Sequence, residues 1–86
     1  MIMNWNEVNN KLNAEFTFED FSQAWAFMTE VALMAERKNH HPEWSNVWNK
    51  VNISLSTHDA GGVVTEKVRK LADGISKIYE RYQNRS

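Results

Sequence analysis

The feature that most constrains the fold of this chain is a change in the period of its apolar residues. From Lys11 to Phe18 apolar and polar residues alternate, which is typical of a strand with one buried face. From Phe21 to Ala35 apolar residues instead recur every three or four positions, as on one side of an α-helix. The apolar residues expected on that side are Phe21, Ala24, Trp25, Met28, Val31, Ala32 and Ala35.

Start and stop signals bound this first helix. Thr17 precedes Asp20 by three residues, a capping-box-like arrangement that predicts Thr17 as the N-cap, with acidic residues in the first turn. Pro42 disfavours helical backbone at His41, so the helix is expected to end within residues 38–40.

Two hairpins are expected, one on each side of this helix. Trp5 to Val8 is a weaker strand pattern, and Asn9-Asn10 suits a two-residue turn because asparagine tolerates positive φ. After the proline, Glu43 to Trp48 and Val51 to Thr57 are strand-like around a predicted Asn49-Lys50 turn. This register would place Trp48 opposite Val51, Asn46 opposite Ile53 and Trp44 opposite Leu55, with His41 and His58 at the same end of the hairpin.

A second helix completes the pattern. Gly61-Gly62 ends the last strand, Thr65 suits the N-cap position, and Gly74 inside the helix costs up to ~1 kcal/mol relative to alanine. The expected apolar side consists of Val68, Leu71, Ala72, Ile75, Ile78, Tyr79 and Tyr82.

The predicted fold class is therefore α+β, with the order ββαββα in a single domain over residues 1–86. A four-stranded antiparallel sheet carries both helices on one face and leaves the other face relatively polar. Because the chain has 86 residues and no cysteine, disulfides cannot supplement its small core. We expect a homodimer or homotetramer.

Charge and hydropathy exclude several classes of partner. The formal net charge of -1 gives no broad positive field, so no nucleic-acid partner is expected. The first residues have neither a basic start nor a long apolar run, so neither a signal peptide nor a membrane span is expected. The absence of cysteine fits a cytoplasmic location.

Three histidines are the candidate catalytic residues. His40 and His41 follow the first predicted helix, and His58 follows the last predicted strand. Ends of elements often carry functional side chains, and imidazole exchanges protons near neutral pH. Glu36 and Asp59 are nearby in the sequence and could orient an imidazole or bind a polar substrate.

Other chemistries have weaker support. An isolated surface histidine is most often simply solvated, so the residue types alone do not establish catalysis. Adjacent histidines lack the i, i+4 spacing of zincins and cysteine is absent, so no metal site is expected. Ser54 and Ser56 lack the strained turn that exposes a nucleophilic serine.

Two linked motifs resemble those of the pterin-4a-carbinolamine dehydratase family. One is the run from Ala35 to Val51, which contains His40-His41-Pro42, and the other is the run from Leu55 to Gly62, which contains Thr57-His58-Asp59. The similarity extends from Trp5 into the second helix and includes the separation of the motifs. Many members carry a further N-terminal helix, whereas four residues precede Trp5 here, so the assembly is a point where this chain could differ.

The resemblance implies a function and roles for the five candidate residues. It implies that a 4a-hydroxytetrahydrobiopterin or related pterin is dehydrated to the quinonoid dihydropterin without metal or organic cofactor, in support of an aromatic amino acid hydroxylase. It also implies that His40 and His58 protonate the departing hydroxyl, and that His41 contacts the pterin with a base role. Glu36 is implied to bind substrate, and Asp59 is a further candidate for substrate binding.

Two alternative functions stay open. Animal members of the family also act as dimerisation cofactors of a homeodomain transcription factor, and a related pterin enzyme could belong to molybdopterin metabolism. The intact set of histidines favours the enzyme.

Overall fold

The structure, a computed structural model, describes residues 5–56 and 64–83. Its elements follow the predicted order ββαββα, which confirms the α+β fold class. They are β1 (Asn6–Val8), β2 (Lys11–Thr17), α1 (Phe21–Arg37), β3 (Glu43–Val47), β4 (Lys50–Leu55) and α2 (Glu66–Gln83).

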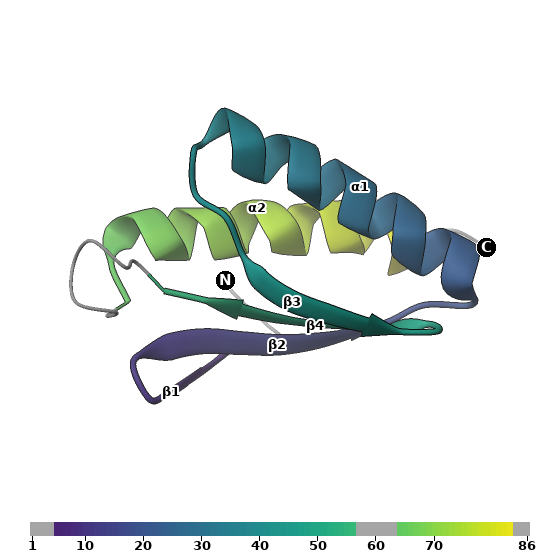
Figure 1. Cartoon of the computed structure of the whole chain (residues 1–86), viewed down its shortest axis with the longest axis horizontal. Coiled ribbons are helices and arrows are strands. Elements are labelled where there is room, and N and C mark those ends of the chain that lie inside the picture. Colours follow the sequence, from purple (N-terminus) through teal and green to yellow (C-terminus); the bar gives the residue numbers. More distant parts are fainter. Residues whose placement is uncertain (1–4, 57–63, 84–86) are drawn as a thin grey trace.

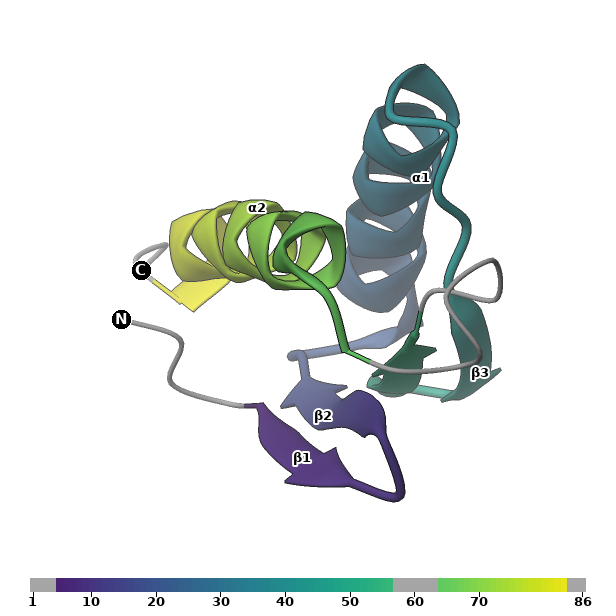
Figure 2. The ribbon, with the colours of Figure 1, turned by 90° about the vertical axis from the view of Figure 1, so that its left-hand side faces the viewer.

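The four strands form one antiparallel sheet in the order β1-β2-β4-β3. Both helices lie on the same side of it, as predicted, and the opposite side carries no helix of the described chain (Figure 1, Figure 2). The turn between β1 and β2 is also confirmed, because Asn9 and Asn10 have φ of 54° and 63°. Both values suit a two-residue hairpin turn, and asparagine is tolerated there.

The predicted register of the second hairpin is wrong by two residues. Trp44 pairs with Ile53 and Asn46 with Val51, so the turn residues are Trp48 and Asn49. The Asn46 side chain explains the earlier turn, because its Nδ2 donates to the carbonyl oxygens of Trp48 and Lys50 at 3.0 and 2.9 Å. Since side chains alternate with a period of two, the shift leaves each residue on the face expected for it.

The predicted start of α1 is also wrong. Asp20, not Thr17, is the N-cap, and its carboxylate accepts a hydrogen bond of 2.8 Å from the backbone nitrogen of Gln23. Thr17 remains in β2, opposite Lys50 of β4. The strand ladder thus includes Thr17, and the helix cap lies three residues later than predicted.

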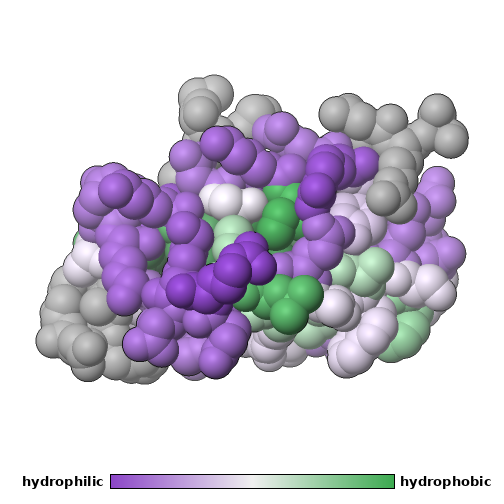
Figure 3. Space-filling model, turned by 90° about the horizontal axis from the view of Figure 1, so that it is seen from above, coloured by the Kyte–Doolittle hydropathy of each residue, from purple (hydrophilic) through white to green (hydrophobic). Residues whose placement is uncertain are grey.

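The buried side of α1 differs in part from the predicted one. Phe21, Trp25 and Ala32 are exposed, with Trp25 57% exposed, and Phe21 stacks on Trp25. Hydrophobic residues are visible at the surface among hydrophilic ones on the helical side of the molecule (Figure 3). Apolar residues cover more than half of this helix, so periodicity alone could not select the buried side. The residues that are buried are Ala24, Phe27, Val31, Met34 and Ala35.

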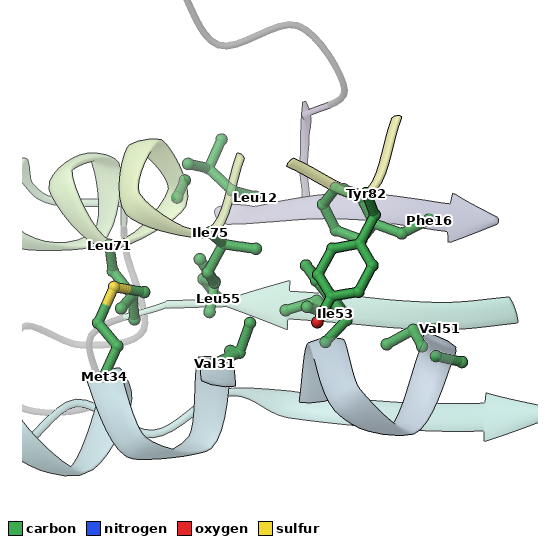
Figure 4. Packing of buried hydrophobic residues seen from close by; sticks show 14 of the residues in the cluster. Leu12, Phe16, Val31, Met34, Val51, Ile53, Leu55, Leu71, Ile75 and Tyr82 are labelled. Carbon is green, nitrogen blue, oxygen red and sulfur yellow. The ribbon is translucent and has the colours of Figure 1, made fainter. Parts of the chain in front are cut away.

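The core lies between the sheet and the two helices (Figure 4). Rings from three elements meet there, with the Phe16 ring centroid 5.2 Å from that of Phe27 and 4.7 Å from that of Tyr79. The apolar side of α2 is confirmed in that Val68, Leu71, Ala72, Ile75 and Tyr82 are buried, while Ile78 and Tyr79 are half-buried.

Gly74 of α2 faces the Met34 side chain of α1. A Cβ atom at this position would lie 2.8 Å from Met34 Sδ, closer than van der Waals contact allows. A side chain at residue 74 would therefore require the flexible end of Met34 to shift.

No helix in the described part of the chain is both long and apolar enough to cross a membrane.

Candidate functional site

The end of α1 is built by a helix-terminating motif that positions both adjacent histidines. The His40 backbone nitrogen donates to the Ala35 carbonyl oxygen at 3.0 Å, and the Asn39 nitrogen donates to the Glu36 oxygen at 3.1 Å. Asn39 has a φ of 51°. These two bonds and the left-handed residue define a Schellman motif, which turns the chain sharply at the helix end.

This turn directs His40 into the protein. His40 is 8% exposed, and its Nε2 lies 3.0 Å from the backbone carbonyl oxygen of Ser56, the residue directly after β4. The bond joins the end of α1 to the end of β4, one of the two inner strands of the sheet. The other ring nitrogen, Nδ1, is buried and has no hydrogen-bond partner among residues 5–56 and 64–83.

His41 has the opposite environment. Its side chain is 60% exposed, and Nε2 lies 2.9 Å from Glu36 Oε1, one turn back on α1. An exposed pair of this kind contributes little to stability. It does restrict the orientation of the imidazole, so the structure shows Glu36 in contact with His41.

Three of the five predicted site residues are thus brought together by the end of α1. The other two, His58 and Asp59, lie outside the described residues. His58 follows Ser56 by two positions in the sequence, and Ser56 contacts His40. The convergence of His58 with the other two histidines stays a prediction.

Sequence reasoning missed two contributors to the site. Asn39 sets the helix-ending turn, and its signal was available, since asparagine is favoured where backbone φ is positive. The carbonyl of Ser56 is the second. No sequence signal could identify it, because any residue supplies the same backbone acceptor.

Serine and acidic side chains also border depressions on the open face of the sheet. No group of three or more histidine, cysteine or acidic side chains with metal-binding geometry occurs within residues 5–56 and 64–83. Two shallow depressions of about 490 Å³ lie over the open face of the sheet, and Ser54 borders both. Neither is lined by His40 or His41.

The fold and the site together define a class of protein. It is an α+β domain that carries a buried histidine and an exposed histidine–carboxylate pair at the end of one helix. Comparison with known proteins gives the family, because residues 2–78 match the model of the pterin 4 alpha carbinolamine dehydratases. The chain belongs to this family.

Individual relatives agree. A protein of Prochlorococcus marinus strain MIT 9515 is 49% identical over 80 residues, which cover 93% of this chain and 82% of that protein. One from Rhizorhabdus wittichii is 51% identical over 76 residues, covering 88% and 77%. Both are provisionally named pterin-4-alpha-carbinolamine dehydratases.

Solved structures share the fold. A Brucella melitensis protein described as a transcriptional coactivator/pterin dehydratase has a TM-score of 0.86 and 40% identity, over 91% of this chain and 84% of that one. A pterin dehydratase-like RuBisCO assembly factor of the alpha-carboxysome has a TM-score of 0.78 over 90% of both chains. At 24% identity, the second likeness concerns the fold alone.

Proposed function

We propose that this protein dehydrates 4a-hydroxytetrahydrobiopterin, a pterin-4a-carbinolamine, to the quinonoid dihydropterin. The observation that carries the proposal is the buried His40, held by one ring nitrogen beside the His41–Glu36 pair, within the part of the chain that matches the family. Two imidazoles with different environments are a suitable starting point for acid and base roles at one site.

The chemistry needs one proton donated and one removed. Hydroxide is a poor leaving group, so an acid must protonate the 4a-hydroxyl as its bond to carbon breaks, and N5 must lose its proton. Acid-base help of this kind contributes ~10²–10⁴-fold to rate. We assign the acid role to His40 and His58, and pterin contact with a base role to His41.

The carboxylates complete the proposal. Glu36 accepts a hydrogen bond from His41 and so orients that ring. We therefore assign it an orienting role in addition to the substrate contact expected from the family resemblance. Asp59 is proposed to bind substrate through its carboxylate.

In the cell, this activity would return the oxidised pterin to a reductase and so support an aromatic amino acid hydroxylase. The proposed mechanism requires neither metal nor organic cofactor. The proposed location is the cytoplasm. The proposed assembly is a homodimer or homotetramer, because one side of the sheet carries no helix of the described chain.

The test is direct dehydration. A 4a-hydroxypterin is generated in situ by a hydroxylase, and formation of the quinonoid product is followed by ultraviolet absorbance. We expect the protein to accelerate the reaction above its spontaneous rate and the His40→Ala variant to lose most of that acceleration. A folded wild-type protein that leaves the spontaneous rate unchanged would refute the proposal.

The same assay separates the alternatives. The Brucella relative is described as both coactivator and dehydratase, which is the reason to retain a role as a transcription-factor dimerisation cofactor. That role predicts a partner-dependent function that survives substitution of the histidines. A pterin enzyme of molybdopterin metabolism would prefer a different pterin in competition experiments.

A further inference from the structure

The hydrogen bond of His40 determines which of its ring nitrogens carries a proton. A carbonyl oxygen only accepts hydrogen bonds. Because Nε2 lies 3.0 Å from the Ser56 carbonyl oxygen, Nε2 must be the donor. The neutral ring is therefore the Nε2–H tautomer, and its Nδ1 has a free lone pair.

That lone pair is buried without a partner in the described chain. His40 is 8% exposed, and Nδ1 makes no hydrogen bond to residues 5–56 or 64–83. Most buried polar side-chain atoms in proteins have a partner, because an unpaired one costs free energy. An unpaired nitrogen on an otherwise fixed ring suits an atom reserved for a bound molecule.

We infer that His40 exchanges the reacting proton through Nδ1, and that the Ser56 carbonyl is the positioning group that fixes this choice. The inference rests on the proposed function. It extends that function by naming the ring nitrogen that transfers the proton and the backbone carbonyl that determines which nitrogen is free to do so.

The step balances as follows. The imidazolium Nδ1–H bond breaks and its proton joins the 4a-hydroxyl, while the C4a–O bond breaks with its electron pair going to oxygen. Water leaves, N5 gives its proton to a base, and the former N–H electron pair forms the C4a=N5 bond. His40 is left as the Nε2–H tautomer, which is the neutral form that the Ser56 carbonyl stabilises.

His41 provides an internal contrast. Its Nε2 also points to an acceptor, Glu36 Oε1, but the side chain is 60% exposed, so water competes for this contact. Within the described site, only His40 is a buried ring whose tautomer is fixed by a hydrogen bond to a backbone carbonyl.

The tautomer can be measured directly by nuclear magnetic resonance. Two-bond nitrogen–proton correlations of the ¹⁵N-labelled full chain distinguish a protonated from a bare ring nitrogen. We expect neutral His40 to show a protonated Nε2 and a bare Nδ1, and saturating dihydrobiopterin to shift Nδ1 more than Nε2. A protonated Nδ1 in the neutral ring, or a larger shift at Nε2, would overturn the inference.

Two amide variants give an independent test. The amide nitrogen of His40→Gln can reach the position of Nε2 and donate to Ser56, whereas the shorter His40→Asn places its amide near Nδ1. We expect the Gln variant to keep a urea midpoint near that of the wild type and the Asn variant to have a lower one. Both should lose ~10²-fold or more in turnover, because neither amide exchanges protons as imidazole does.

These outcomes are separable from failure of the proposed function. If the wild type does not dehydrate the carbinolamine, the proposed function fails whatever the tautomer. If the wild type is active and His40→Gln retains more than about a tenth of its turnover, the function stands, but proton exchange through Nδ1 is refuted.

Discussion

The imidazole of His40 and the backbone carbonyl of Ser56 join the end of the first helix to the end of the last strand, with 3.0 Å between nitrogen and oxygen. Sixteen positions separate the two residues in the sequence. The contact fixes the position of a candidate catalytic ring relative to the sheet. Substitution of His40 therefore measures how much this contact contributes to the stability of the protein.

The first prediction concerns replacement of His40 by alanine. The change removes a buried hydrogen bond and leaves a small void, so the free energy of unfolding should fall by about 1–3 kcal/mol. Turnover should fall by ~10²–10⁴-fold. Urea unfolding and the dehydration assay measure the two effects, and His41→Ala is the matched control, which should leave stability within about 0.5 kcal/mol of the wild type.

The second prediction concerns the turn at Asn39. Since φ there is 51°, Asn39→Ala should destabilise the protein by about 1 kcal/mol, whereas Asn39→Gly should be neutral or slightly stabilising. The alanine variant should also reduce turnover, because the turn places His40. Equal stability of the two variants would show that the turn is not maintained by residue 39.

The third prediction concerns the carboxylate of Glu36. Its Oε1 accepts from His41 Nε2, and the side-chain oxygen of Glu36→Gln can do the same, whereas Glu36→Ala removes the acceptor. We expect the alanine variant to lose more kcat than the glutamine variant, with little change in stability for either. If both variants raise KM equally and leave kcat intact, Glu36 binds substrate and does not orient His41.

The fourth prediction is that activity does not depend on metal. The mechanism uses imidazoles as proton donors and acceptors, so exhaustive chelation should leave turnover unchanged. Loss of activity that zinc restores would contradict this.

The fifth prediction is self-association. One side of the sheet carries no helix of the described chain, and Phe21, Trp25, Val47 and Trp48 are exposed large apolar residues. Light scattering at micromolar concentration should report a mass at least twice the 10.1 kDa of the chain. A stable monomer at this concentration would contradict the proposed homodimer or homotetramer.

Much of the fold could be predicted from the sequence because its periods are distinct. The alternating residues of β2 and the apolar side of α2 each allow one assignment, and the structure has both. The start of α1 could not be located in this way, because Thr17 and Asp20 are both good N-caps. Pairing of Thr17 with Lys50 in the sheet decided between them.

The site was predictable only in its residue types. The double histidine indicated proton chemistry, but adjacent positions in a sequence gave no sign that one ring would be buried and the other exposed. That difference arises from the left-handed backbone at Asn39 and from an acceptor sixteen residues beyond His40. Interactions of this kind depend on tertiary structure, which periodicity does not report.

The strand order has a consequence for local unfolding. β4 pairs on both sides, with β2 and with β3, whereas β1 has three exposed residues and a single neighbour. Amide hydrogens of β1 should therefore exchange with solvent through small local openings, while those of β4 should require opening of most of the domain. The acceptor of His40 is carried at the end of this slowly exchanging strand, so fraying of the first hairpin would leave the geometry of the histidine intact.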